Sequence, residues 1–300
     1  MTRDAVLTDA QWNVVEPLLP CSDGVRGRPF RDHRQVIEGI IYRYRCGVPW
    51  RDLPADFGPW QTVWKRHRRF AADGTWDVVL TALLSLADAA EVIDWSAVAV
   101  DSTSCRVHQH GATLARDTQG APSNYTNLCD EPADHALGRS RGGLTTKIHQ
   151  LCDGQGLPLV VLIGPGHAHD SPMFDPLMGE LRVPRVGPGR PRTRPAAVLG
   201  DKAYSSRAHR ARLRARGICA VIPEPSTQID HRRRRGSRGG RPVGLDIQKY
   251  KRRNVIERSF NIVKNWRGLA TRYDKLALTY RAAVVLAAIC AWLRHLGDTP

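Results

Sequence analysis

The hydrophobic pattern of this 300-residue chain changes its period once, close to residue 93. Before that point, apolar residues recur at helical spacing. Four helices are expected there, over residues 8–19, 33–45, 60–71 and 76–90. After it, short β-branched runs alternate with helical segments. The pattern therefore predicts an all-α domain over residues 1–93, and an α/β domain with a mixed sheet flanked by helices over residues 94–300.

The helix expected over residues 60–71 has two chemically different sides. Its apolar side includes Val63 and Phe70. The opposite side is basic and includes Lys65, Arg66, Arg68 and Arg69. An apolar-backed helix with a basic face, preceded by another helix and a turn, is typical of helix-turn-helix units that contact DNA. An ordinary amphipathic surface helix has the same pattern, and this segment alone favours neither interpretation.

In the second part, strands and helices are expected in alternation. The strands are expected at residues 96–100, 145–151, 157–163, 196–199 and 218–222. The helices are expected at residues 172–181, 207–216, 250–266 and 276–296. Before the third of these helices, residues 224–248 include Arg232, Arg233, Arg234 and Arg235 among several glycines. Arg and Gly at this density cannot pack a core, so a mobile loop is expected.

The positive charge of the chain is concentrated in its last third. The whole sequence has a formal net charge of +16, whereas residues 202–300 alone have 23 basic and 6 acidic side chains, a net charge of +17. A one-sided basic field of this size indicates a polyanionic partner, which we expect to be nucleic acid. The alternative is a basic surface with no specific partner.

Several classes of protein are not expected from this sequence. The longest strongly apolar run, residues 282–293, is shorter than the roughly 20 residues of a membrane span, so no membrane partner is expected. No signal peptide is expected at the N-terminus. Seven cysteines without a Cys-x-x-Cys motif argue against a disulfide scaffold and a thiolate zinc site. We therefore expect a cytoplasmic protein.

Two aspartates have similar settings at the ends of predicted strands. Asp101 and Asp201 each follow a short hydrophobic run and precede small or polar residues. Functional side chains are commonly presented at strand ends, and two such carboxylates in one sheet would share a divalent cation. Each aspartate, taken singly, is also a common turn or cap residue.

The helix expected over residues 250–266 has a polar stripe. Tyr250, Arg253, Glu257 and Lys264 fall within an arc of about 60° at 100° per residue. The neighbouring apolar arc can dock on the sheet, which would leave the stripe at the edge of the buried face. A carboxylate between two basic side chains in that position is a candidate functional group. The alternative is a simple i,i+4 ion pair between Arg253 and Glu257.

The spacing of these four residues matches the C-terminal signature of bacterial insertion-sequence transposases of the DDE type. The VDST block at residues 100–103 resembles the first-aspartate strand of that family, and GDKAY at residues 200–204 resembles its second-aspartate block. Residues 7–12 and 47–54 are similar to the insertion-sequence-5 group in particular. The resemblance covers nearly the whole chain.

The resemblance implies an RNase H-like core in which Asp101, Asp201 and Glu257 are the catalytic, metal-binding carboxylates. Oxygen ligands suit Mg²⁺ or Mn²⁺, and two such ions can activate the attacking oxygen and stabilise the leaving oxygen in a displacement at phosphorus. The first attack would use water and release a 3′-hydroxyl at the element end. The second would use that 3′-hydroxyl on target DNA.

The resemblance also implies double-stranded DNA as the partner and a homo-oligomer assembled on it, in association with the nucleoid. Arg253 and Lys264 would contact phosphates near the scissile bond, and Tyr250 would bond a phosphate or stack on a base. The arginine-rich loop would hold the DNA backbone, and the basic helix face would provide further contacts.

Other candidates have weaker signals. His108 and His110 follow Asp101 closely and could line a cleft, and Lys147 lies in a predicted central strand. A zinc site at the short His pairs is a minor alternative. The competing functions are a non-transposing nuclease with the same core, either domesticated or inactive, and a DNA-binding regulator.

Overall fold

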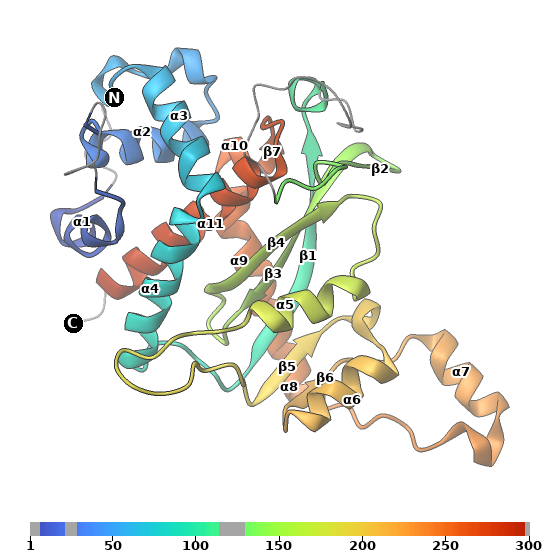
Figure 1. Cartoon of the computed structure of the whole chain (residues 1–300). Coiled ribbons are helices and arrows are strands. Elements are labelled where there is room, and N and C mark those ends of the chain that lie inside the picture. Colours follow the sequence, from blue (N-terminus) through green and yellow to red (C-terminus); the bar gives the residue numbers. More distant parts are fainter. Residues whose placement is uncertain (1–6, 22–28, 114–129, 298–300) are drawn as a thin grey trace.

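The computed structural model describes residues 7–21, 29–113 and 130–297. A mixed sheet of seven strands lies at the centre, and a group of helices lies beside one end of it (Figure 1). The strands are β1 (Val98–Val107), β2 (Gly138–Ser140), β3 (Gly143–Cys152), β4 (Pro158–Pro165), β5 (Ala197–Gly200), β6 (Cys219–Val221) and β7 (Thr271–Arg272). The prediction of a mixed α/β architecture is confirmed.

The strand order through the main part of the sheet is β4-β3-β1-β5-β6. β3 is antiparallel to both β1 and β4, whereas β5 and β6 run parallel to β1. The short strand β2 pairs with the beginning of β3, and the short strand β7 pairs with the end of β1. The hairpin predicted between the second and third strands is the β3–β4 pair.

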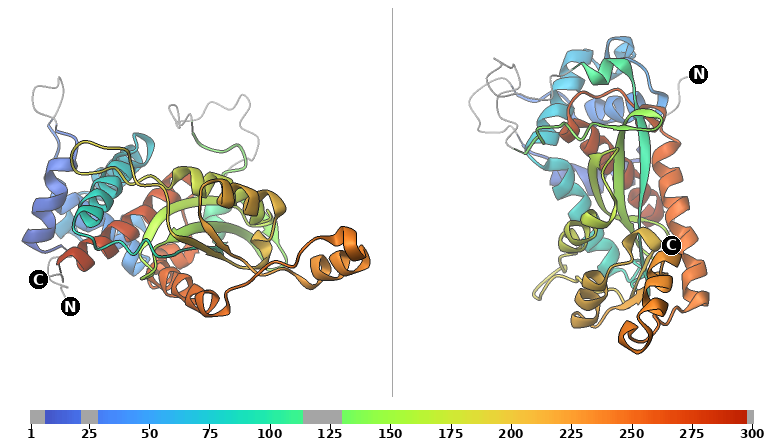
Figure 2. Two further views of the ribbon diagram at one scale, coloured as in Figure 1. Left: turned by 90° about the horizontal axis from the view of Figure 1, so that it is seen from below. Right: turned by 90° about the vertical axis from the view of Figure 1, so that its right-hand side faces the viewer.

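The helices surround this sheet and continue beyond it (Figure 2). They are α1 (Asp9–Val15), α2 (His33–Cys46), α3 (Trp60–Ala72), α4 (Thr75–Ala89), α5 (Phe174–Glu180), α6 (Arg207–Ala215), α7 (Ser226–Arg234), α8 (Ile247–Lys251), α9 (Val255–Lys264), α10 (Arg267–Ala270) and α11 (Ala277–Gly297). Thr8 caps α1 through the predicted capping box with Gln11. The expected helix positions in the N-terminal part are confirmed.

The two faces of the sheet have different partners because side chains alternate along each strand. Ala99 and Leu199 face α9, where they pack with Ile256 and Phe260. The alternate residues, such as Val100, belong to the larger core on the other face. The apolar arc predicted for the helix after residue 250 therefore docks on the sheet.

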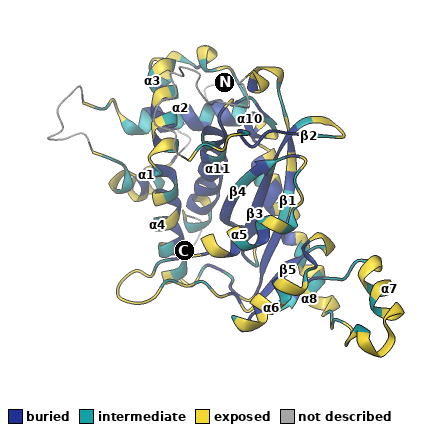
Figure 3. Cartoon of the chain, turned by 45° about the vertical axis from the view of Figure 1, so that its right-hand side comes forward, coloured by how far each residue is buried: buried dark blue, intermediate teal, exposed yellow. Residues whose placement is uncertain are grey.

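The large core continues without interruption from the N-terminal helices to the sheet. The connecting element is α11, which packs on α3, α4 and β4. This helix has 21 residues and is long and apolar enough to cross a bilayer, which the shorter apolar run at residues 282–293 did not indicate. Most of α11 is buried inside the protein, as expected for a core helix (Figure 3).

The N-terminal helices differ from a helix-turn-helix unit. Residues 47–59 separate α2 from α3 and contain two short 3-10 helices, whereas the turn of such a unit has three or four residues. Arg66 is also not on an outer face. Its side chain is 6% exposed, lies over the Phe30 ring and contacts His33 Nδ1. The prediction that Arg66 lies on the basic outer face of this helix was wrong, because the residues that cover it, Phe30 and His33, come from a distant segment.

The arginine-rich segment is more ordered than predicted. It begins with α7, which projects away from the sheet, and continues into a 3-10 helix over residues 236–239 (Figure 1). No residue of α7 is buried. The segment therefore lacks a core, as expected, but its first half is helical instead of a loop.

Candidate active site

Asp101 lies on β1, and Asp201 directly follows the neighbouring parallel strand β5. Val100 of β1 pairs with Gly200 of β5, and each aspartate directly follows one of these two residues. Asp101 shares the face of Ala99, which packs under α9. The negative charge of Asp201 also tends to raise the pKa of the Asp101 carboxyl. The structure brings these two predicted site residues together.

The two aspartates differ in their local structure. Asp201 follows the end of β5, as predicted, and its carboxylate accepts a hydrogen bond from the Ala203 amide at 2.8 Å. Asp101 is not at a strand end, because β1 continues for six residues beyond it. These further residues pair with β3 and β7. The sequence did not predict them as strand because they are mostly polar.

The helix predicted over residues 250–266 is interrupted. α8 ends at Lys251, a 3-10 turn covers residues 252–254, and α9 begins at Val255. The interruption places the Arg253 guanidinium against the sheet, where its Nη1 lies 2.6 Å from Asp101 Oδ2. Its Nη2 lies 3.5 Å from Glu257 Oε1. Arg253 therefore connects two of the three predicted carboxylates.

The electrostatics around Asp101 and Asp201 favour an added positive charge. Burial raises the pKa of Asp101, and the charge of Asp201 raises it further, whereas the Ser102 amide and Arg253 act in the opposite direction. Tyr204, in the turn after Asp201, is fully buried, and its hydroxyl has no hydrogen-bond partner among the described residues. Burial and the charges of Asp101, Asp170 and Asp201 raise its pKa.

The three predicted carboxylates are of the chemical type that binds divalent cations. Asp101, Asp201 and Glu257 offer only oxygen ligands, which Mg²⁺ and Mn²⁺ prefer. Arg253 stands between two of these carboxylates and balances their charge, as a cation would. Within the part of the chain that the structure describes, no three His, Cys, Asp or Glu side chains are close enough to hold a metal ion. Glu257, 57% exposed, has to approach the aspartates for a three-carboxylate site.

A polar cluster that the sequence did not reveal lies beside Asp101. Ser102 donates its amide to Asp101 Oδ1 at 2.8 Å and its hydroxyl to Asp170 Oδ1 at 2.6 Å. Lys147 Nζ lies 2.9 Å from the same Asp170 oxygen. Burial tends to raise the pKa of Asp170, but the bonds from Ser102 and Lys147 lower it overall. The signal for Asp170 was only its place directly after one of the short His pairs, in the sequence His-Ala-His-Asp at residues 167–170.

Lys147 does not share the face of Asp101. Residues directly opposite in a ladder share a face; Lys147 is opposite Ser104, whereas Gln150 is opposite Asp101. Lys147 is connected to the residues around Asp101 indirectly: it pairs with Asp170, which accepts a hydrogen bond from Ser102 on the face of the sheet opposite to Asp101. The ring of His108 lies beside those of His110 and Tyr273, 4.8 Å from each.

The predicted DNA-contacting residues have different surroundings. Lys264 and Lys65 are exposed, and Tyr250 is half-buried against the core under α9. Arg69 is exposed and pairs with Asp73 at 3.7 Å. In the arginine-rich segment, Arg233, Arg234 and Arg235 are exposed.

Arg232 is the exception in that segment, because it forms a close ion pair with Glu224 and is 17% exposed. The predicted DNA-contacting residues of α3 and α7 do not lie near Asp101. α3 and α7 are in separate parts of the molecule (Figure 1).

Comparisons with known proteins connect this site to a family. Residues 95–293 match the family described as "Transposase DDE domain". Residues 7–80 match a second family, described as "Putative transposase of IS4/5 family". Together these matches cover the helical part and the sheet. No solved structure matches the chain.

Curated relatives cover parts of the chain. The "Putative transposase for insertion sequence element IS6501" of Brucella ovis is 32% identical over 155 residues, which are 50% of this chain and 100% of the relative. The "Insertion element IS402 uncharacterized 16.2 kDa protein" of Burkholderia cepacia is 38% identical over 117 residues, 37% of this chain and 80% of the relative. The "Putative transposase for insertion sequence element IS402" from the same organism is 31% identical over 139 residues, 46% and 57% of the two chains.

Proposed function

This chain belongs to the DDE transposases of the insertion-sequence 4/5 group, and we propose that it cuts and joins DNA through Asp101, Asp201 and Glu257. Its general activity, DNA transposition, follows from the family. The observation that carries the residue assignment is the adjacency of Asp101 and Asp201 across β1 and β5, with Arg253 between Asp101 and Glu257.

The fold proposed for the sheet part is RNase H-like. The order β4-β3-β1-β5-β6, with only β3 antiparallel to the others, supports this proposal because it places both aspartates on the central pair of strands. We also propose a functional division near residue 93, with the N-terminal helices as the DNA-binding part. The separate family match over residues 7–80 supports that division.

A divalent cation is required by this family, and Mg²⁺ or Mn²⁺ is the proposed identity. Asp101, Asp201 and Glu257 would hold it, and when bound it lowers the barrier to displacement at phosphorus. The Ser102 amide holds the Asp101 carboxylate and the Ala203 amide holds the Asp201 carboxylate. Arg253 and a cation would compete for the Asp101 carboxylate, and an Arg253 side chain released from Asp101 would be free to neutralise a phosphate oxygen.

The remaining contacts orient the DNA. Lys264 lies two helical turns from Glu257 on the same stripe of α9 and would contact the backbone beside the cut. The exposed arginines of α7 would reach the duplex farther away, as would Lys65 and Arg69 of α3. Arg66 and Arg232 are already engaged within the protein and contribute less. A homo-oligomer on DNA is proposed because two element ends have to be joined.

The decisive test is cleavage of a plasmid carrying the DNA that flanks the gene. Purified protein is incubated with Mg²⁺, Mn²⁺ or EDTA, beside Glu257→Gln and a matched exposed control, Glu180→Gln. We expect metal-dependent nicks at two discrete flanking positions, unchanged in the control and absent in Glu257→Gln. Full cleavage by Glu257→Gln would remove that residue from the site. Salt-sensitive binding without cleavage under any metal would favour the DNA-binding regulator.

A further inference from the structure

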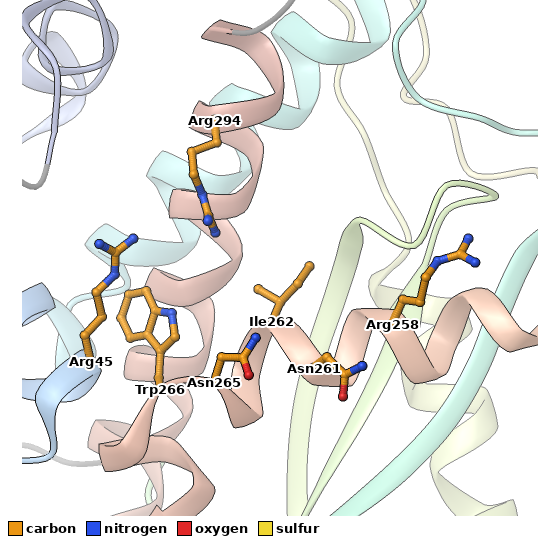
Figure 4. A pocket seen from close by; sticks show the side chains of 7 residues that line it. All are labelled: Arg45, Arg258, Asn261, Ile262, Asn265, Trp266 and Arg294. Carbon is orange, nitrogen blue, oxygen red and sulfur yellow. The ribbon is translucent and has the colours of Figure 1, made fainter.

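A basic groove lies on the flank of α9, away from the aspartates. It has a volume of about 460 Å³. Its polar lining consists of Arg45, Arg258, Arg294, Asn261 and Asn265, around the edge of Trp266. The three arginines come from α2, α9 and α11, which are far apart in the sequence and meet here (Figure 4). We call this the α9 groove.

Among the residues that the structure describes, no acidic side chain pairs with the arginines of the α9 groove, and none lines the groove. Arg45 lies over the Trp266 ring at 5.3 Å, and Arg294 Nε donates to the carbonyl of Cys290. These contacts hold the Arg45 and Arg294 guanidinium groups while leaving most of their donors available. Arg45 and Arg294 line one end of the groove and Arg258 lines the other (Figure 4), so positive charge extends along its length and favours a bound anion.

The chemistry of the lining indicates a phosphate backbone instead of a base. Trp266 is only 4% exposed, so its ring forms the floor and offers no free face for stacking. Arginine and asparagine side chains are the common donors to DNA phosphate and sugar oxygens. Arginine also matches the paired oxygens of a phosphodiester in a bidentate geometry.

The α9 groove begins next to the proposed catalytic residue. Arg258 directly follows Glu257, Asn261 lies about one turn farther along α9, and Asn265, which caps the end of α9, lies about two turns farther. Eight residues at 1.5 Å each place Asn265 about 12 Å from Glu257 along the axis. One DNA strand advances 3.4 Å per base pair, so this distance corresponds to about three to four nucleotides.

We propose that the α9 groove binds the DNA sugar–phosphate backbone about three to four nucleotides from the scissile phosphate. The position rests on the proposed function of Glu257; the binding itself rests on the groove. Because Arg45 belongs to the N-terminal helices and Arg258 to the sheet part, one stretch of backbone would contact both parts of the chain at once.

The test measures binding of a labelled duplex carrying the element end, without metal, over a range of salt concentrations. The variants are Arg45→Gln with Arg294→Gln, and Arg258→Gln alone. The matched control is Arg190→Gln, an exposed arginine in the segment between α5 and β5. Each lost phosphate contact lowers the slope of log affinity against log salt by about 0.9. We expect a roughly tenfold weaker affinity per arginine, and no change in the control.

Folding and position are checked independently. Thermal unfolding shows whether a variant is folded, and Arg294→Lys keeps the charge if Arg294→Gln is unstable. Ethylation of phosphates about three to four nucleotides from the nick is expected to interfere with binding of the wild type. That interference is expected to disappear in the groove variants only.

The outcomes separate the groove from the catalytic proposal. If the wild type cleaves and the groove variants keep its affinity and salt slope, the groove proposal is overturned and the catalytic one stands. If the wild type binds without cleaving and the groove variants lose affinity, the groove is supported and the catalytic assignment fails. If the wild type does not bind this DNA even at low salt, both fail.

Discussion

Two arginine–carboxylate pairs of this protein differ in how deeply they are buried. Arg43 of α2 pairs with Asp274, before α11, at 3.6 Å, and the two side chains are 5% and 6% exposed. Arg253 pairs with Asp101 at 2.6 Å, and these side chains are 21% and 20% exposed. The first pair is surrounded by protein, whereas the second faces solvent in part.

The neighbours of each pair explain the difference. Asp274 also accepts a hydrogen bond from Tyr44, which contacts His67, so the buried pair belongs to a network between the N-terminal helices and the C-terminal segment. Arg253 instead contacts a second carboxylate, Glu257, that is largely exposed. A buried pair cannot exchange partners without leaving a charge unpaired. A pair that is partly exposed to solvent can exchange partners. The Arg43–Asp274 pair is therefore suited to stabilising the fold, and the Arg253–Asp101 pair is suited to a role in chemistry.

The largest expected effect comes from removing the carboxylate of the partly exposed pair, Arg253 and Asp101. Asp101→Asn should lower DNA cleavage by at least about 10³-fold, the scale for losing a group that acts in the transition state. The free energy of unfolding should change by less than about 1 kcal/mol, because the pair is partly solvated. Plasmid nicking and urea unfolding measure the two quantities.

A large loss of stability in Asp101→Asn would contradict this difference between the two pairs. If its free energy of unfolding falls as far as that of a variant of the buried Arg43–Asp274 pair, then the Arg253–Asp101 pair also stabilises the fold. The same assays on Asp201→Asn serve as the parallel case, since Asp201 has no arginine partner within 4 Å among the described residues.

Breaking the buried pair should act on stability first. Asp274→Ala leaves Arg43 buried and unpaired and removes the acceptor of Tyr44, so the free energy of unfolding should fall by about 3–5 kcal/mol. Urea unfolding measures this. Replacing both partners with apolar residues, Arg43→Met with Asp274→Leu, should recover most of the loss. No recovery would mean that the pair does more than satisfy its own charges.

Acid should weaken the buried network through His67. Burial lowers the pKa of His67 from 6.5 to about 4, although Asp274 and the Thr279 carbonyl act in the opposite direction. The unfolded chain therefore binds a proton between these pH values that the folded protein does not, and stability falls as pH decreases from about 6.5 to 4. At 1.36 kcal/mol per pKa unit, the loss approaches about 3 kcal/mol.

The measurement compares wild type with His67→Phe by urea unfolding across this pH range. The variant should lose this part of the pH dependence while keeping the contribution of His149, whose pKa is also lowered by burial to about 4. Identical pH slopes in the two proteins would show that His67 is not buried neutral.

The comparison also shows what the sequence could predict. Helical spacing and the capping box located the N-terminal helices, and the hydrophobic runs before Asp101 and Asp201 located β1 and β5, because both signals are local. Which strands become neighbours is not local, and the adjacency of the two aspartates came from the family resemblance and the placement at strand ends. The roles of Asp101, Asp201 and Glu257 remain predictions.

Three features could not be predicted because they depend on distant residues. A helical wheel assigns Arg66 to a face, but Phe30 and His33 decide whether that face is covered. Regular helix geometry was assumed through residues 252–254, where the 3-10 turn lets Arg253 reach a strand 152 residues earlier in the chain. The bond between Ser102 and Asp170 likewise joins two segments that no periodicity connects.

The smallest expected effect tests how tightly the buried junction is packed. Gly268 of α10 crosses α2 so closely that an added Cβ would lie 3.0 Å from the Tyr44 carbonyl oxygen and 3.1 Å from its Cα. Both atoms are backbone and cannot turn away, so Gly268→Ala should cost about 1–3 kcal/mol by overpacking. Gly179→Ala, in α5 with no atom near the added Cβ, should instead stabilise by roughly 0.5–1 kcal/mol. Urea unfolding of both variants decides the matter: a neutral Gly268→Ala would mean that α2 and α10 can separate, and the junction would then be a hinge instead of a rigid support for Arg43 and Asp274.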